Sequence, residues 1–408
     1  MNVLLCVPER ITRKLGAPKV YVELSEALEE KGCSCELVGV EDVAPNISQY
    51  DGKEGKITHY SQQLREYISR RTGEFDVVEF EHKHLPFPHS SLPENVLLVA
   101  RSVLLGHHAR SIRLPIWEGV SGILQNTLEH LMERGRKRTD VQLKDYLTTL
   151  KKHVGTAVRY ELNRTKRQRQ AERTTETCRA ADLVIASNSH DRRTLEEKGI
   201  DPQKIKILPF GLSDERYEAL SPSAWTVPDP PTFVFIGTHD FRKGGATDIP
   251  RIAYRLLAEF SSARIRLLGT RGLFANEEEV LAHFRPDVQG RVEVVPVYSP
   301  GNLPELLQDG TIGLFPSYYE GFGFGVLEML ASGLPVVAYN VPGPPEMLPD
   351  DLLVPSGDWK QLADKAKRLV MSDSLEECRR MANTRAHGFQ WSNIAEQTIE
   401  AYRGRTGI

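Results

Sequence analysis

The chain has 408 residues, of which 40% are apolar and 26% are charged, and its formal net charge at pH 7 is −3. This composition is that of an ordinary soluble globular protein, and the length favours two domains. No apolar run reaches the roughly 20 residues that a membrane-spanning helix needs. The cysteines are scattered and lack the neighbours of a zinc site, so we expect reduced thiols in a cytoplasmic protein. They are Cys6, Cys33, Cys35, Cys178 and Cys378.

Short apolar runs alternate with helical patterns through the first half of the chain. A helix is predicted over residues 21–32, where apolar residues recur at helical spacing until Gly32. The N-terminus is too short and lacks the basic lead of a signal peptide, so it is predicted to be a buried strand. This rhythm predicts a parallel sheet covered on both faces. The strands are expected at residues 2–7, 35–40, 75–80 and 95–103.

From Pro115 to about Ala181 the pattern becomes helical, which predicts an insertion in the first domain. Apolar residues recur there at steps of three and four, so we expect them to form one face that packs on that domain. They are Leu143, Leu147, Leu150, Val154 and Val158. Residues 134–173 hold 13 Lys/Arg against 4 Asp/Glu. Such a basic segment indicates either an anionic partner or simply a solvated helix surface.

A second alternating set of strands follows the proline-rich stretch 220–231, which we interpret as the linker. We therefore expect an N-terminal domain at 1–212, with the insertion at about 115–180, and a second domain at 213–390. Residues 391–408 are predicted to form an amphipathic helix that packs back on the first domain. Doubly wound folds place ligands at the carboxyl ends of their strands, here in the cleft between the two domains.

The stretch SYYEGFGFGVLEML at residues 317–330 holds two glutamates, Glu320 and Glu328, around three glycines. It is predicted to run from a strand through a turn into a helix. Glycines let a ligand approach the backbone, and the helix start offers amide groups and a positive dipole end for a diphosphate. The carboxylates suit sugar hydroxyls, so the segment fits a nucleotide sugar. Two other readings stay open: Glu328 as a routine helix residue, and a dinucleotide fingerprint, although the glycine spacing differs from that motif.

The longer segment 316–348, PSYYEGFGFGVLEMLASGLPVVAYNVPGPPEML, resembles the donor site of the family-four retaining glycosyltransferases. Their hallmark is a pair of glutamates separated by seven residues, which Glu320 and Glu328 match. The resemblance extends through residues 357–359 and the final helix. It implies an α/β protein of the GT-B fold, with two Rossmann-like doubly wound parallel-sheet domains and a deep cleft between them.

By this resemblance Glu320 would contact the donor hexose, and Glu328 would contact the ribose hydroxyls. Lys243, in FIGTHDFRKGG, lies where the family has a lysine that neutralises the donor diphosphate. The expected catalytic residues are Glu320, Lys243 and His107. The expected donor-binding residues are Gly16, Arg242, Lys243, Glu320, Gly321, Phe322, Gly323, Phe324, Gly325, Val326, Leu327 and Glu328.

The sequence departs from the family at three places. Thr238 stands where an arginine is usual, and Arg242 is expected to replace it because a guanidinium suits phosphate. Gly16 is followed by Ala17 instead of a second glycine. Val103 lies close to the position where relatives often have a histidine. His107 and His108 follow, and we expect His107 to take that role ahead of its neighbour.

The resemblance implies a retaining, metal-independent hexosyltransferase that moves a hexose from a nucleotide-diphosphate sugar to an acceptor hydroxyl. No cofactor is expected, since the nucleotide sugar is a substrate. The acceptor would be a glycan, a lipid-linked molecule or a small molecule. The alternatives are a GT-B nucleotide-sugar epimerase and a non-catalytic sugar-nucleotide-binding subunit.

Residues 134–173 are expected to meet an anionic membrane surface or an anionic acceptor. Nucleic acid is not expected, because only Tyr146 and Tyr160 could stack on bases there. The predicted location is cytoplasmic. If the basic segment meets a membrane, the protein would lie at the inner face of that membrane.

Overall fold

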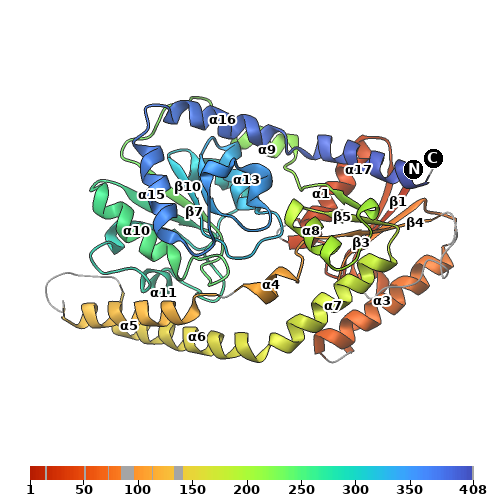
Figure 1. Cartoon of the computed structure of the whole chain (residues 1–408), viewed down its shortest axis with the longest axis horizontal. Helices are drawn as coiled ribbons and strands as arrows, with labels where there is room; N and C mark the ends of the chain where they lie inside the picture. Colours follow the sequence, from red (N-terminus) through yellow and green to blue (C-terminus); the bar gives the residue numbers. More distant parts are fainter. Residues whose placement is uncertain are drawn as a thin grey trace. The chain divides into compact units, whose positions relative to one another are not determined.

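The computed structural model of the chain describes residues 1–13, 16–49, 52–71, 73–83, 96–112, 114–132 and 141–406. The chain forms two compact units (Figure 1). The first unit combines Met1–Arg110, Thr165–Asp214 and Phe389–Ile408. The second unit combines Ser111–Arg164 and Glu215–Gly388. Residues 134–138, which hold four of the predicted basic side chains, lie outside the described residues.

The first unit is built on a six-stranded sheet in which every pair of neighbours is parallel, in the order β2-β1-β3-β4-β5-β6. Its strands are β1 (Asn2–Cys6), β2 (Ser34–Val38), β3 (Val77–Glu81), β4 (Leu97–Arg101), β5 (Leu183–Ala186) and β6 (Ile205–Ile207). Its helices are α1 (Gly16–Glu30), α2 (Val40–Val43), α3 (Gly52–Arg70), α4 (His108–Ser111, which reaches the boundary), α7 (Arg164–Ala180), α8 (Ser189–Glu197) and α17 (Trp391–Thr406).

Helix α17 is held to the first unit by polar as well as apolar contacts. It packs beside α1, and its Tyr402 hydroxyl donates to the Glu79 carboxylate over 2.6 Å. Glu79 also accepts two hydrogen bonds from Arg101, and all three side chains are fully buried. A buried ion pair needs such hydrogen bonds to compensate its lost hydration. The carboxyl-terminal helix is therefore an integral part of the first unit.

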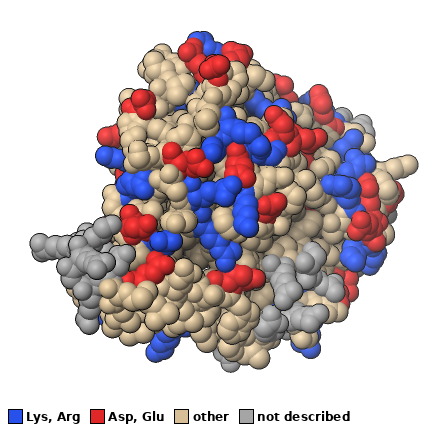
Figure 2. Space-filling model, turned by 60° about the vertical axis from the view of Figure 1, so that its left-hand side comes forward, with Lys and Arg blue, Asp and Glu red and all other residues tan. Residues whose placement is uncertain are grey.

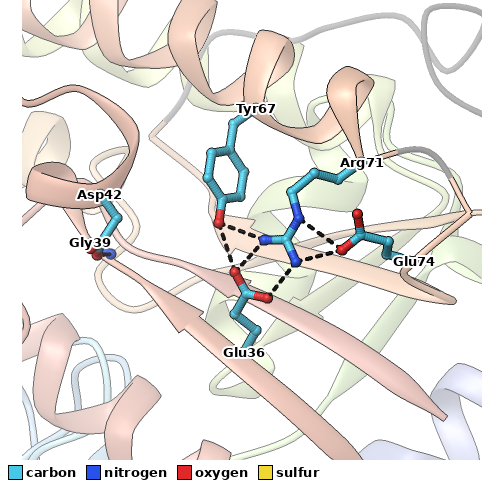
Figure 3. Close-up of polar contacts among 6 residues, drawn as sticks. All are labelled: Glu36, Gly39, Asp42, Tyr67, Arg71 and Glu74. Atoms are coloured by element: carbon cyan, nitrogen blue, oxygen red, sulfur yellow. Dashed lines mark hydrogen bonds and ion pairs between the residues drawn. The ribbon is translucent and has the colours of Figure 1, made fainter.

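The end of α3 is fastened to the edge strand β2 by a cluster around Arg71 (Figure 3). The Arg71 guanidinium donates to Glu36 over 2.9 Å and to Glu74 over 2.9 Å. Tyr67 donates to the same Glu36 carboxylate over 2.7 Å. The Arg71 guanidinium also lies 4.8 Å from the centre of the Phe75 ring, which adds a cation–π contact.

We expect Arg71→Ala to lower the free energy of unfolding by about 1–2 kcal/mol, because it removes a partly exposed network as well as the ring contact. The hydrogen bond from Arg71 lowers the pKa of Glu36. The stabilisation is therefore present above the unfolded-state pKa and fades as the pH falls through the folded-state pKa. Urea unfolding at neutral pH and below pH 4 measures both effects.

The matched control is Arg70→Ala. Arg70 pairs with Glu66 in a far more exposed bridge, with side chains 78% and 53% exposed, so its loss should change stability by less than about 0.5 kcal/mol. Equal losses in the two variants, or a loss at Arg71 that persists at low pH, would contradict this account.

The second unit has its own six-stranded parallel sheet, in the order β12-β11-β10-β7-β8-β9. Its strands are β7 (Thr232–Ile236), β8 (Arg264–Leu268), β9 (Val292–Val295), β10 (Ile312–Phe315), β11 (Val336–Tyr339) and β12 (Leu353–Val354). Its helices are α5 (Ile116–Met132), α6 (Leu143–Leu162), α9 (Asp214–Leu220, which starts at the boundary), α10 (Asp248–Glu259), α11 (Glu277–Leu281), α12 (Leu303–Leu307), α13 (Phe324–Ala331), α14 (Pro344–Met347), α15 (Trp359–Val370) and α16 (Leu375–His387).

The strand order of the second sheet reverses between β7 and β10, which are neighbours. The helices that follow these two strands, α10 and α13, therefore lie on opposite faces of the sheet. Helices α10 and α15 pack together, whereas α13 packs with α16 (Figure 1). Such a reversal is the place where doubly wound sheets bind ligands.

Residues 115–164 of the predicted insertion at about 115–180 belong to the second unit, so their assignment to the first domain is wrong, whereas residues 165–180 lie in the first unit. Helices α5 and α6 lie side by side, and α6 packs against α11 (Figure 1). The side of α6 that packs on the unit carries Tyr146, Thr149, His153 and Ala157, all buried. These residues recur at steps of three and four, as a helix face requires.

The apolar face that the sequence predicted to be buried lies largely in solvent instead. Leu147 is 54% exposed, Val158 is 50% exposed and Val154 is 39% exposed. The sequence did not predict the buried side of α6, because the residue at its centre is a histidine and not an aliphatic residue. His153 donates from Nε2 to Nε2 of His283 over 2.8 Å, since Nδ1 of His283 donates to the Glu279 carbonyl. Burial lowers the pKa of His153 to about 2, so this ring is neutral.

Candidate functional site

Two loops meet at the carboxyl ends of β7 and β10, where the strand order reverses. The backbone of one is hydrogen-bonded to the other: the Tyr318 amide donates to the Arg242 carbonyl over 2.7 Å. The Arg242 guanidinium donates to the Tyr319 carbonyl over 2.9 Å. Gly244 has a φ of +71°, and a Cβ there would lie 2.2 Å from the Pro316 carbonyl oxygen. The two loops thus form one surface, and a glycine at 244 permits it.

Glu320 lies at the centre of this surface. Its carboxylate is 2.5 Å from the Lys243 ammonium and 3.5 Å from the Arg242 guanidinium, and it accepts a hydrogen bond from the Ser317 hydroxyl. Burial by itself raises the pKa of Glu320, but the two cations and the hydrogen bonds outweigh it and hold the pKa below its usual value. The carboxylate is therefore ionised, and one positive charge remains in excess among these three groups.

The position of Lys243 is set by its own loop. The Lys243 amide donates to the Asp240 carboxylate over 2.8 Å, and the Thr238 hydroxyl donates to the same carboxylate over 2.7 Å. The ammonium lies 5.4 Å from the centre of the Phe315 ring. The side chain is only 17% exposed. Thr238 thus helps to fix the loop.

Glycines shape the turn between β10 and α13. Gly323 has a φ of +96° and is the N-cap of α13, a conformation that favours glycine. A Cβ on Gly325 would lie 3.1 Å from the Ile236 carbonyl oxygen, so α13 approaches the end of β7 closely. Gly343 lies against the backbone of Phe322, where a Cβ would come within 2.2 Å of the carbonyl oxygen. The positive end of α13 therefore lies at the same strand ends as Lys243.

Glu328 lies just over one turn into α13 and is nearly buried. Its carboxylate accepts a hydrogen bond from Arg216 over 3.3 Å, and Arg216 also donates to the Pro300 carbonyl. The structure therefore brings Glu320 together with Arg242 and Lys243, whereas Glu328 has its own cation. Neither Arg216 nor Ser317 was predicted from the sequence, because nothing in their local patterns marks them.

A buried carboxylate, that of Asp248, holds the turn between β10 and α13 in place. Asp248, at the start of α10, accepts hydrogen bonds from the Tyr318 and Tyr339 hydroxyls, each over 2.6 Å. Burial raises the pKa of Asp248, and the two hydroxyls oppose that effect. This link ties the loop that carries Glu320 to α10 and β11. Because Tyr318 lies two residues before Glu320, it restrains the catalytic candidate directly.

The remaining predicted residues, Gly16 and His107, belong to the first unit. Gly16 has a φ of +76° and begins α1. The His107 ring lies 2.9 Å from the Thr175 hydroxyl and is nearly buried. His108 lies 2.8 Å from Asp191, which also accepts from the Ser102 hydroxyl. The predicted roles of Gly16 and His107 toward the donor remain predictions.

Within the described residues, no group of three or more His, Cys, Asp or Glu side chains is arranged to hold a metal ion. Among the helices described here, none is both long and apolar enough to cross a membrane.

Residues 230–372 match the family model of "Glycosyl transferases group 1". The D-inositol 3-phosphate glycosyltransferase of Acidothermus cellulolyticus is 28% identical over 338 residues, which cover 78% of this chain and 73% of that protein. The enzyme of the same name from Nocardia farcinica is 29% identical over 54% of this chain. That match spans only about half of the relative's length, 52%.

Solved structures share the fold. Sucrose-phosphate synthase from Thermosynechococcus elongatus superposes with a TM-score of 0.67 at 16% identity, covering 99% of both chains. HepE from Anabaena, solved in complex with UDP, superposes with a TM-score of 0.60 at 13% identity, covering 99% of this chain and 100% of that one. At such identities the likeness establishes the fold, which is GT-B, and the predicted fold class is confirmed.

Proposed function

We propose that this chain, which belongs to the group 1 glycosyltransferases and has the GT-B fold, transfers a hexose from a nucleoside-diphosphate sugar to an acceptor hydroxyl with retention of configuration. The observation that carries the proposal is the Lys243–Glu320 pair beside the start of α13, at the strand reversal of the second sheet. A UDP-binding neighbour such as HepE makes a nucleoside diphosphate the natural donor group to test.

The site suits a leaving diphosphate. The bond from the anomeric carbon to the phosphate oxygen breaks, and negative charge grows on the diphosphate. Lys243, Arg242 and the positive end of α13 can stabilise that charge, more in the transition state than in the bound donor. Glu320 holds Lys243 in place and offers a carboxylate to the hexose hydroxyls.

Retention follows if the acceptor oxygen attacks the face from which the diphosphate departs. A carbon–oxygen bond to the acceptor then forms as the donor bond breaks, and the acceptor proton passes to the departing phosphate. No protein nucleophile is required. The buried Glu320, already paired with two cations, acts by orientation in this scheme.

Activity should persist in excess EDTA, because side-chain cations and a helix start supply the positive charge that a divalent ion would otherwise bring to the diphosphate. The measurement is the initial rate of sugar transfer with and without chelator. A rate that vanishes in EDTA and returns with manganese or magnesium would contradict metal independence. It would leave the glycosyltransferase assignment standing.

A thermal-shift screen of UDP-, GDP- and ADP-sugars should identify the donor. A ligand at a hundredfold excess over its dissociation constant adds about 2.7 kcal/mol of stability. Glu328→Ala should weaken binding of that donor, since each hydrogen bond to a charged group contributes about 1.5–3 kcal/mol. Glu293→Ala, at a partly exposed carboxylate on β9 that pairs with Arg266, is the matched control and should keep the shift. Binding that survives Glu328→Ala unchanged would place the nucleotide elsewhere.

The proposed acceptor is a glycan, a lipid-linked molecule or a small molecule that carries a hydroxyl group. Two of the relatives are D-inositol 3-phosphate glycosyltransferases, and an anionic acceptor would suit the basic segment 134–173. Comparing phosphorylated and unphosphorylated polyols as acceptors separates these classes. Incubation with the donor alone should leave the sugar unchanged, whereas an epimerase would convert it.

A further inference from the structure

The hairpin formed by α5 and α6 exposes an apolar surface that no part of the proposed reaction uses. Nine of the 15 exposed large apolar side chains of the described chain lie on these two helices. We refer to these nine as the hairpin face: Trp117, Leu124, Leu128, Leu131, Met132, Leu147, Val154, Val158 and Leu162. The other six are scattered singly, which is normal for a protein surface.

The members of the hairpin face share one side of each helix. On α5, Trp117, Leu124, Leu128 and Leu131 are separated by seven, four and three residues, so they project in one direction. The opposite side of α5 carries Ile116, Gly119, Ile123 and Asn126, which are buried. The helix is thus apolar on two sides, and the second unit covers only one.

Helix α6 repeats the arrangement. Leu147, Val154, Val158 and Leu162 follow steps of seven, four and four, away from the buried side at Tyr146 and His153. The two helices lie side by side, and both pack on the second unit by their buried sides, so each exposed stripe faces away from that unit. In Figure 2 the lower part of the view, where α5 and α6 lie, is largely free of charged side chains. Higher on the same face, Lys and Arg side chains alternate with Asp and Glu side chains.

Basic residues lie within this apolar surface and not only around it. Lys151 is exposed and lies four residues after Leu147 and three before Val154, which puts it on the same side of α6. Lys144, three residues before Leu147, is exposed as well.

We propose that the hairpin face docks on the surface of an anionic lipid bilayer. Large apolar side chains with a tryptophan among them, interleaved with lysines, are what a helix lying in the bilayer interface requires. The apolar side chains enter the acyl boundary while the lysine ammonium groups reach the phosphates of the headgroups. The bilayer would thereby bind the second unit through an element that is separate from the donor site.

A second copy of the chain is the competing occupant, and Lys151 counts against it. A dry interface between two hairpins would bury this ammonium between Leu147 and Val154 without its hydration, which is unfavourable unless an anionic partner compensates it. The acidic residues of α5 are Glu118 and Glu129, on a different side of the helix, and Glu129 already lies 3.5 Å from Arg285. At a bilayer the same lysine keeps its hydration and gains anionic neighbours.

Sedimentation of the full chain with vesicles tests the proposal. The protein should bind vesicles of phosphatidylcholine mixed with phosphatidylglycerol, bind phosphatidylcholine alone more weakly, and lose binding as salt rises. Combining Lys144→Glu with Lys151→Glu should lower the partition coefficient tenfold or more, since each basic residue near an anionic surface is worth about fivefold. Combining Leu124→Ser, Leu128→Ser and Val158→Ser should lower it by at least as much.

Matched controls come from exposed residues elsewhere. Met371→Ser with Met381→Ser, and Lys206→Glu with Arg264→Glu, should leave the partition coefficient within about twofold of wild type. Trp117 provides a direct probe because it is 61% exposed. Brominated lipids should quench its emission, and the quenching should disappear in Trp117→Phe.

Unchanged vesicle binding in both test variants, the Lys144→Glu/Lys151→Glu variant and the triple serine variant, would overturn the proposal. Trp117 emission that brominated lipids do not quench would overturn it as well. If the wild-type protein does not bind vesicles but forms a concentration-dependent dimer, and the triple serine variant does not form that dimer, the hairpin face would be assigned to a second copy of the chain instead. The assay needs neither donor nor acceptor, so its outcome is independent of the proposed reaction.

Discussion

Lys243→Ala should lower kcat about a hundredfold or more while changing the donor dissociation constant far less. The ammonium lies 2.5 Å from Glu320 and beside the start of α13, where the proposed diphosphate departs. Charge on the diphosphate grows as the donor bond breaks, so the interaction is stronger in the transition state than in the complex. Loss of one such group typically costs 10²–10³ in rate.

The variant also removes the nearest cation from a buried carboxylate. Lys243 and Arg242 together hold the pKa of Glu320 low against the effect of burial. Without Lys243 this pKa should rise, and the residual activity should fall at a higher pH than in the wild type as the pH is lowered. Measuring kcat across pH therefore distinguishes loss of a charge from loss of the loop structure.

Lys243→Arg and Lys206→Ala are the controls. The arginine keeps the charge and should retain part of the rate, whereas Lys206 is an exposed residue of the first unit and should not matter. An unchanged kcat in Lys243→Ala, or a defect confined to the donor dissociation constant, would refute a role in stabilising the leaving group.

The donor loops could be predicted from the sequence because the residues that form them are close together in the chain. A buried strand, a turn with glycines and a helix follow one another within residues 311–332, and the structure has β10 and α13 there. The structure also has strands at the four predicted ranges of the first domain, as β1, β2, β3 and β4. The two-residue β12 was missed because Leu353–Val354 is too short to show a period. The fold class could be inferred for the same reason, since the alternation of strands and helices persists through both units.

The contacts that complete the site could not be predicted in this way. Arg216 reaches Glu328 from 112 residues away, and no motif connects them. The insertion was assigned to the wrong unit because apolar periodicity identifies a helix face but not its partner. Two faces of α6 have helical period, and the one with Tyr146 and His153 packs on the second unit. The more aliphatic face remains exposed, which composition alone would not suggest.

Gly244→Ala should destabilise the second unit by about 2–4 kcal/mol and abolish most activity. Gly244 has a φ of +71°, which strains any residue with a Cβ, and that Cβ would lie 2.2 Å from the Pro316 carbonyl oxygen. The two loops must then separate, and Lys243 moves away from Glu320. A displacement of about 1 Å in such a site can cost a hundredfold in rate.

The matched control is Gly290→Ala, in the same unit. Nothing lies within 4 Å of a Cβ there and its φ is not positive, so stability and activity should stay close to wild type. Thermal unfolding and initial rates of both variants measure the difference. Normal stability in Gly244→Ala would mean that the loops can part without cost. Full activity in that variant would mean that the contact between Lys243 and Glu320 does not have to be maintained by the packing of the two loops.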